Sequence, residues 1–348
     1  MQKLWITAPF VDNFGGQKPN FGVFFWLYLF FSVSSHSILY NSKIVKLSNT
    51  IVNFSQDPRP LILVTNDDGY DAPGIRHLVR ALHGMGRIVE VAPDSPQSGK
   101  ACGFTAHDRL HLRRVSDDGD LLFYTCSGTP VDCVKLSLHH IFRDRRPDLI
   151  VSGINHGGND SICVMYSGTM GAVLEGCIVG IPAIGFSLLE FNWNADFGTA
   201  EEVVRTIVPQ VLPKGMPRGT VLNVNIPYRK DLKGYKVCRQ ADGFWCKEYI
   251  DLNVEREEDL VFFTAGQYAN REPDATDTDE YYLRQGYVSI VPCRVDLTAS
   301  LSLSQFKYLE FPPHEAPLAP FFRVSGGSPA GFRHPSFRCN GNPDLNIK

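Results

Sequence analysis

The sequence has few features that would point to nucleic acid, zinc or a membrane. No run of Lys and Arg stands out, and 34 basic against 37 acidic residues leave a formal net charge of -3. Polymeric nucleic acid and anionic membrane surfaces are therefore not expected partners. The nine cysteines occur singly, without the close pairs of a zinc site, and we interpret them as reduced thiols, mostly in the core of a cytosolic protein. No apolar run reaches the roughly 20 residues of a membrane span, and we find no internal repeat. A globular protein of one large domain or two small ones remains.

Both ends of the chain differ from its middle. Residues 21–35, FGVFFWLYLFFSVSS, form an apolar run behind a weakly basic start, which leaves a signal peptide or an anchor as one interpretation. The run is aromatic rather than Leu-rich and lacks a clear small-residue cleavage site, so we favour an extension foreign to the domain, and a cytoplasmic protein. We expect residues 1–58 to be an atypical, poorly ordered extension. Residues 299–348, rich in Pro and Gly, are expected to form a poorly ordered tail.

Between these ends, strand and helix patterns alternate. A buried-strand run at 60–65 is followed by apolar residues at helical spacing, and the same order repeats as far as a strand at 221–227. Further strands are expected at 87–92, 121–126, 148–153 and 182–187, and helices at 130–141, 171–180 and 199–208. This alternation predicts an α/β fold, with a mainly parallel sheet and helices on both faces over a core at 59–230. Shorter strand patterns then predict a small β-rich appendage at 231–298.

Polar clusters follow four of the predicted strands. The first strand runs into Asn66, Asp67, Asp68 and Gly69, and the others run into APDSPQSGK, SGTP and INHGGND. In a parallel sheet the carboxyl ends of the strands meet at one edge, where ligands bind, so these four loops are expected to share a rim.

The Asp67–Asp68 pair allows two interpretations. Asp-Gly is a common turn dipeptide, so in one interpretation the carboxylates belong to a solvated or capped turn. Two adjacent carboxylates also raise each other's cost of ionisation, a cost that a divalent cation removes. Because oxygen ligands dominate, that cation would be Mg²⁺, Mn²⁺ or Ca²⁺, one per subunit, with Ser98 and Asn155 as neutral ligands.

A second element is the stretch Ser167-Gly168-Thr169, which precedes a predicted helix. Its hydroxyls and free backbone N–H groups would cradle a phosphate at the helix N-terminus, although an ordinary Ser/Thr cap gives the same pattern. Bound cation and phosphate together would mean phosphate ester chemistry, with direct attack of water favoured over a covalent aspartate. Candidate general acids are His107, His156 and the His139–His140 pair. His156 is the best placed of them, and a supporting role for its side chain stays open.

Five motifs then match a known family in order and spacing. VTNDDGYDAPGI, APDSPQSG, SGTPVDCVKL, PDLIVSGINHGGN and YSGTMGAVLEGCIVGIPAI resemble the survival protein SurE family of metal-dependent nucleotidases, over residues 59–298. The resemblance implies a Rossmann-like core with a swapped C-terminal hairpin and a homodimer or homotetramer. It also implies hydrolysis of nucleoside 5′- and 3′-monophosphates, with short polyphosphate an additional substrate of some members. Asp67, Asp68, Ser98 and Asn155 correspond to metal ligands, and Asn66 with Ser167, Gly168 and Thr169 to residues around the phosphate.

The sequence thus predicts a cytoplasmic phosphatase that requires a divalent metal and acts on nucleoside monophosphates, with Asp67, Asp68, Asn66 and His156 as its catalytic residues. One alternative is a nucleotide-binding module of the same fold without turnover. Another, a secreted or anchored acid phosphatase, depends only on residues 21–35. Trp245 or Tyr249, in the appendage, would stack on the base.

Overall fold

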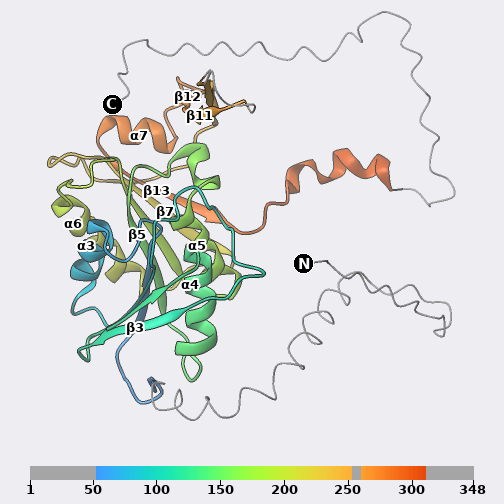
Figure 1. Cartoon of the computed structure of the whole chain (residues 1–348). Helices are drawn as coiled ribbons and strands as arrows, with labels where there is room; N and C mark the ends of the chain where they lie inside the picture. The colour runs from blue at the N-terminus through green and yellow to red at the C-terminus, as the bar shows by residue number, and fades with distance from the viewer. Residues whose placement is uncertain (1–51, 253–259, 311–348) are drawn as a thin grey trace, which may run out of the picture. The chain divides into compact units, whose positions relative to one another are not determined.

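The computed structural model describes residues 52–252 and 260–310, so the apolar run at 21–35 and most of the predicted tail lie outside the described residues. A nine-stranded sheet forms the centre, in the order β3-β4-β2-β1-β5-β6-β7-β13-β8 (Figure 1). Its strands are β1 (Leu61–Thr65), β2 (Arg87–Pro93), β3 (Leu112–Asp117), β4 (Leu121–Cys126), β5 (Leu149–His156), β6 (Ala183–Leu188), β7 (Thr220–Ile226), β8 (Tyr235–Val237) and β13 (Val288–Arg294). The six strands from β4 to β7 in this order pair in parallel, which confirms the predicted mainly parallel sheet.

Helices cover both faces of the sheet. The α-helices are α3 (Pro73–Leu82), α4 (Pro130–Leu136), α5 (Gly168–Ile178), α6 (Gly198–Val211) and α7 (Asp279–Gln285). A π-helical segment, η2 (Ser137–Ile141), and two 3₁₀ helices, η3 (Ser161–Met165) and η4 (Ser300–Leu309), accompany them. α3 and α6 pack together on one face, and α4 and α5 on the other (Figure 1). Local sequence explains where several of them begin. Pro73 occupies the first turn of α3, and Thr129 and Asp132 form a capping box at the start of α4.

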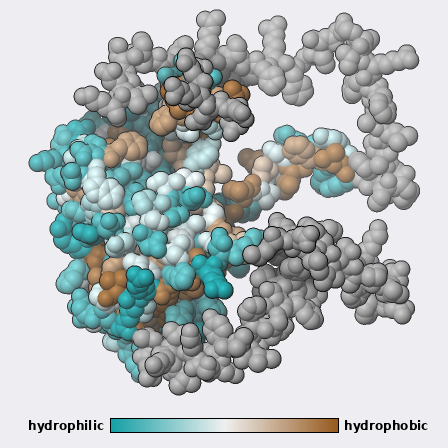
Figure 2. Space-filling view, in the orientation of Figure 1, coloured by the Kyte–Doolittle hydropathy of each residue, from teal (hydrophilic) through white to brown (hydrophobic). Residues whose placement is uncertain are grey.

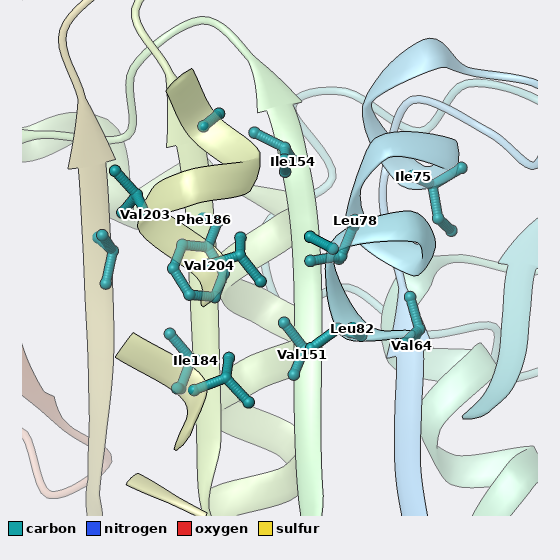
Figure 3. Close-up of a cluster of buried hydrophobic side chains, with 14 of the residues drawn as sticks. Val64, Ile75, Leu78, Leu82, Val151, Ile154, Ile184, Phe186, Val203 and Val204 are labelled. Atoms are coloured by element: carbon teal, nitrogen blue, oxygen red, sulfur yellow. The ribbon is translucent and has the colours of Figure 1, made fainter. Parts of the chain in front are cut away.

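Buried aliphatic side chains hold α3 and α6 against the sheet. Leu78 and Leu82 of α3 and Val203 and Val204 of α6 lie over strand residues such as Phe186, and all five are fully buried (Figure 3). Burying one such side chain contributes about 1.5–3 kcal/mol. Packing on this face therefore fixes the sheet, and with it the loops at the carboxyl ends of the strands.

The strand order reverses between β1 and β5. From β1 the chain proceeds outward through β2 and β4 on one side, and later through β5, β6 and β7 on the other. The adjacent carboxyl ends of β1 and β5 therefore form the crevice in which doubly wound sheets bind ligands. β1 ends one residue before Asn66, and β5 ends at His156.

The predicted appendage contains more than short strands. Two small antiparallel pairs are present, β9 (Gly243–Cys246) with β12 (Gln267–Asn270) and β10 (Tyr249–Asp251) with β11 (Phe262–Thr264). The same region also forms α7, and β13 returns to the central sheet, antiparallel to β7 and parallel to β8. β3, which is not among the strands expected from the sequence, pairs antiparallel with β4 at the sheet edge.

Apolar side chains are exposed on two segments after the core. Those of β10 and β11 include Ile250 at 47% and Phe263 at 58% exposure, and Leu301 and Tyr308 of η4 are 96% and 72% exposed. Figure 2 shows the apolar colouring along η4. Within the part of the chain that the structure describes, no helix is long and apolar enough to cross a bilayer.

Candidate functional site at the reversal of strand order

Asp67 and Asp68 lie directly after β1, in the crevice between the ends of β1 and β5. Both side chains are buried, with 4% and 8% of their residues' surface exposed. Carboxylates are rarely buried to this extent unless charged or polar partners compensate them. The contacts of each one therefore indicate what the site is arranged to hold.

The N-terminus of α5 contacts Asp67. The Thr169 hydroxyl donates to Asp67 Oδ1 at 2.5 Å. Gly168 is packed so closely that a Cβ at this position would lie 2.8 Å from Asp67 Cβ and 3.0 Å from Oδ2, so glycine is required here. Burial first, and then the charge of Asp68, raise the pKa of Asp67 to about 6, while the Thr169 hydrogen bond opposes the shift.

Asp68 is held from β5. The backbone N–H of His156 donates to Asp68 Oδ2 at 3.2 Å, and His156 Nδ1 lies 3.1 Å from the same oxygen. Among the described residues, the other oxygen, Oδ1, has no hydrogen-bond partner. The two consecutive carboxylates are therefore restrained by different elements, Asp67 by helix α5 and Asp68 by strand β5.

Two amide side chains also present oxygen atoms. Asn155 Nδ2 donates to the carbonyl oxygens of His156 and Gly157, at 3.2 and 2.8 Å, which leaves Oδ1 as its ligating atom. Asn66 Nδ2 donates to the Gly69 carbonyl at 2.8 Å. Asn66 Oδ1 is buried and has no hydrogen-bond partner among the described residues. A buried acceptor without a donor is costly, and a bound cation would satisfy it.

The loop after β2 also reaches this edge. The backbone N–H of Gln97 donates to the backbone carbonyl of Asp67 at 2.7 Å, so the loop is attached to the segment that carries Asp67 and Asp68. Ser98, the next residue, is exposed, and the structure shows no contact of its hydroxyl with either carboxylate. The structure thus brings together Asp67, Asp68, Asn155 and Thr169, whereas Ser98 is connected to them only as the residue that follows Gln97.

Ser167 serves as the cap of α5. Its Oγ accepts from the Met170 N–H at 3.1 Å, so the simpler of the two sequence interpretations accounts for this hydroxyl. Helix α5 has 11 residues, and the positive end of its dipole lies beside Asp67. Because the Met170 and Gly171 N–H groups are bonded to Ser167, an anion in the same crevice would meet the N–H groups of Gly168 and Thr169.

A buried amide network supports the loop after β5, and the sequence analysis did not identify it. Asn159 donates to Ser187 Oγ at 2.8 Å, its own N–H reaches Asn225 Oδ1 at 2.7 Å, and Asn223 donates to its carbonyl at 2.8 Å. Asp279, at the start of α7, accepts from the N–H groups of Ser161 and Ala241. The alternating Asn residues in the otherwise apolar β7 were the available signal.

The remaining predicted residues lie elsewhere. His107 is exposed in the loop before β3, and His139 and His140 belong to η2, next to Phe142, which stacks on Phe54. Trp245 of β9 is 36% exposed and makes an edge contact with Tyr268, and Tyr249 of β10 is 66% exposed.

The donors suit a hard divalent cation. No group of three or more His, Cys, Asp or Glu side chains suited to a metal occurs within residues 52–252 and 260–310. The crevice instead offers two carboxylates and two amide oxygens, the chemistry that Mg²⁺, Mn²⁺ and Ca²⁺ select. The orphaned Asn66 oxygen and the like charges of Asp67 and Asp68 are both accounted for by such an ion.

The fold and this crevice define a doubly wound α/β protein with an acidic ligand site where its strand order reverses. The crystal structure of the SurE protein from Aquifex aeolicus matches with a TM-score of 0.64 and 37% identity, over 72% of this chain and all of that one. A protein named 5′-nucleotidase SurE from Flavobacterium psychrophilum is 50% identical over 244 residues, 69% of this chain and 94% of the relative. Its namesake from Flavobacterium johnsoniae is 49% identical over 253 residues, 72% of this chain and 96% of the relative.

A family model described as survival protein SurE matches residues 62–247. The chain belongs to the SurE family.

Proposed function

We propose that this protein is a phosphomonoesterase that requires a divalent metal and hydrolyses nucleoside 5′-monophosphates, and also 3′-monophosphates, to nucleoside and phosphate. The name 5′-nucleotidase, carried by relatives that are 44–50% identical, supports the nucleotidase activity. The observation that carries the proposal is the pair of buried carboxylates, Asp67 and Asp68, beside the N-terminus of an 11-residue helix. Cation ligands and an anion site would then share the same crevice, as a metal-bound phosphate ester requires.

Each residue has a proposed role. Asp67, Asp68 and Asn155 would hold one Mg²⁺ or Mn²⁺, with Ser98 as the further ligand that the family resemblance implies. The bound metal would polarise the phosphoryl group and make a water molecule a better nucleophile. The first turn of α5, Ser167 to Thr169, would bind and orient the phosphate oxygens. Asn66, which the family resemblance also places around the phosphate, would contribute through Nδ2, the donor that is bonded to the Gly69 carbonyl in this structure.

The test uses the purified full-length chain. The protein is stripped of metal with a chelator, and phosphate release is measured from 5′- and 3′-nucleotides before and after Mn²⁺ or Mg²⁺ is added. Asp67→Ala should abolish metal-restored activity, and Asp108→Ala, at an exposed aspartate, should leave it unchanged. If the chain binds Mn²⁺ and nucleotide without turnover, it is a binding module, and if it binds neither, the assignment of the crevice is wrong.

Two further expectations accompany this proposal. We expect a homodimer or homotetramer, because exposed apolar side chains on β10, β11 and η4 would be buried between copies. Light scattering with size-exclusion chromatography would show the oligomeric state directly. The cytoplasm remains the expected location, and cell fractionation of the full chain would test it.

A further inference from the structure

We propose that His156 is a positioning residue that fixes the orientation of Asp68, rather than the general acid that protonates the leaving nucleoside. The inference rests on the proposed function in one respect, namely that Asp68 is a ligand of the metal. It concerns a side chain whose role the sequence left undecided.

Both polar contacts of His156 with Asp68 reach the same carboxylate oxygen. The backbone N–H and the ring Nδ1 approach Oδ2 at 3.2 and 3.1 Å. An ionised carboxylate can only accept hydrogen bonds, so Nδ1 must carry the proton in this contact. Holding Oδ2 from two directions fixes the plane of the carboxylate and leaves Oδ1 directed elsewhere, as a ligand of a cation requires.

Aromatic side chains fix the imidazole ring itself. Trp193 stacks on the ring with centroids 5.1 Å apart and planes 9° apart, and Phe197 meets it edge-on at 5.0 Å and 75°. The side chain of His156 is 6% exposed. Between these two contacts the ring cannot rotate without displacing Trp193 or Phe197, so His156 is rigid in the one orientation that contacts Asp68.

The second ring nitrogen is poorly placed for acid catalysis. Nε2 is buried and has no hydrogen-bond partner among the described residues. A general acid must come within about 2.6–3.2 Å of the leaving oxygen, directly or through one water. Nδ1 contacts Asp68 and Nε2 is buried, so the polar contacts that the ring makes in this structure assign it to holding Asp68.

The experiment compares three full-length variants with the wild type. His156→Ala removes the ring, His156→Asn retains an N–H donor close to the position of Nδ1, and His77→Asn is the matched control. His77 also pairs with a carboxylate, at 2.6 Å from Glu201 Oε1, and also contacts Phe197, but away from Asp68. The Mn²⁺ affinity is measured without substrate, from the electron paramagnetic resonance signal of the free ion. Turnover is measured with adenosine 5′-monophosphate and with p-nitrophenyl phosphate.

A positioning role predicts a specific pattern. His156→Ala should weaken Mn²⁺ binding by about 10- to 100-fold, as for other residues that orient metal ligands, and lower kcat for both substrates by similar factors. His156→Asn should restore Mn²⁺ affinity to within a few-fold of the wild type, and His77→Asn should change neither measurement. p-Nitrophenolate leaves readily without protonation, whereas a nucleoside alkoxide does not. Loss of a general acid would therefore slow the nucleotide selectively and leave Mn²⁺ binding intact, and that result would overturn the proposal. Unchanged Mn²⁺ affinity with unchanged kcat would overturn it as well.

The binding measurement separates this inference from the proposed function. If the wild type binds Mn²⁺ but hydrolyses neither substrate, the proposed activity fails, while the Mn²⁺ affinities of the variants still decide the role of His156. If His156→Ala does not fold, Trp193→Leu serves in its place, because it removes the stacking ring and keeps the imidazole. Trp193→Leu should lose less Mn²⁺ affinity than is expected for His156→Ala. No loss of Mn²⁺ affinity would count against the positioning role of His156.

Discussion

Asp67 and Asp279 are both buried aspartates at the edge of the sheet, yet their surroundings differ. Asp279 is fully buried and accepts three backbone N–H groups, from Ser161 at 2.8 Å, Ala241 at 2.9 Å and Glu280 at 2.8 Å. Asp67 accepts the Thr169 hydroxyl and has Asp68 as its neighbour. Burial raises the pKa of both carboxyls, and at Asp67, where the charge of Asp68 adds to burial, the pKa reaches about 6. Burial is common to both, so it cannot identify the ligand site. The number of hydrogen-bond donors around each carboxylate distinguishes the ligand site, because a carboxylate whose oxygens are already bonded to backbone N–H groups is less open to a cation.

The largest effect that separates the two aspartates is expected from a substitution of Asp67. Asp67→Asn keeps the size of the side chain and removes its charge, so activity should fall about 1000-fold or more, the equivalent of about 4 kcal/mol. The metal-free variant should gain stability, on the order of 1 kcal/mol, because the repulsion with Asp68 is removed. Phosphate release and urea unfolding in the presence of a chelator measure the two effects. A marked loss of stability would mean that Asp67 is structural, like Asp279.

The opposite result is expected at Asp279. Asp279→Ala leaves three buried N–H groups without an acceptor, and we expect a loss of about 3 kcal/mol in the free energy of unfolding. Asp279→Asn keeps one acceptor oxygen and should lose less. Urea unfolding gives both values, and the activity per folded molecule should fall far less than for Asp67→Asn. An unchanged urea midpoint in Asp279→Ala would contradict a structural role for the Asp279 carboxylate.

A substitution of Gly168 tests how closely helix α5 must approach the Asp67 carboxylate. In Gly168→Ala the new methyl group would lie 2.8 Å from Asp67 Cβ, so the carboxylate must move. We expect Mn²⁺ affinity and kcat/KM to fall about 100-fold, because misplaced ligands lose that much. The control is Gly198→Ala, also at the first position of a helix, where the nearest atom is the exposed Asp196 Oδ1 at 3.2 Å. Equal effects in both variants would show that the close approach to Asp67 has no special role.

Glu90 of β2 adds a third kind of buried carboxylate and the smallest expected effect. Burial raises the pKa of Glu90 to about 8, and Arg76 only partly offsets the shift, so the side chain is largely protonated in the folded protein at neutral pH. In the unfolded chain it ionises near 4.5, so folding stability is full below that pH and declines as the pH rises toward 8. At 1.36 kcal/mol per pKa unit, and allowing for relaxation of the charged form, about 2 kcal/mol should be lost between pH 5 and 8.

Glu90→Gln should flatten this dependence in urea unfolding measured across that pH range. Glu202→Gln, at an exposed glutamate of α6, is the matched control and should follow the wild type. A pH dependence of Glu90→Gln as steep as that of the wild type would show that other groups cause the decline.

The sequence predicts the fold and the position of the crevice well, for a physical reason. Asp67 and Asp68 come just after β1, Asn155 lies at the end of β5, and parallel strands bring their carboxyl ends to one edge. The ring contacts of His156 were not predictable, because Trp193 and Phe197 reach the imidazole from the loop after β6, whose sequence carries no local signal of these contacts. α7 is only seven residues long and starts in an acidic stretch that resembles a loop. The insertion of β13 between β7 and β8 is a long-range pairing that a local pattern does not record.

The position of β13 also matters for how the chain is synthesised. The proposed metal and phosphate ligands all precede β6, whereas the strand that lies between β7 and β8 is among the last to leave the ribosome. Until β13 arrives, the edge of β7 is open along its whole length, and an open, apolar strand edge is where nascent chains pair wrongly with one another. The ligand site can thus assemble while the protein is still vulnerable to aggregation, and arrival of β13 marks the end of that interval.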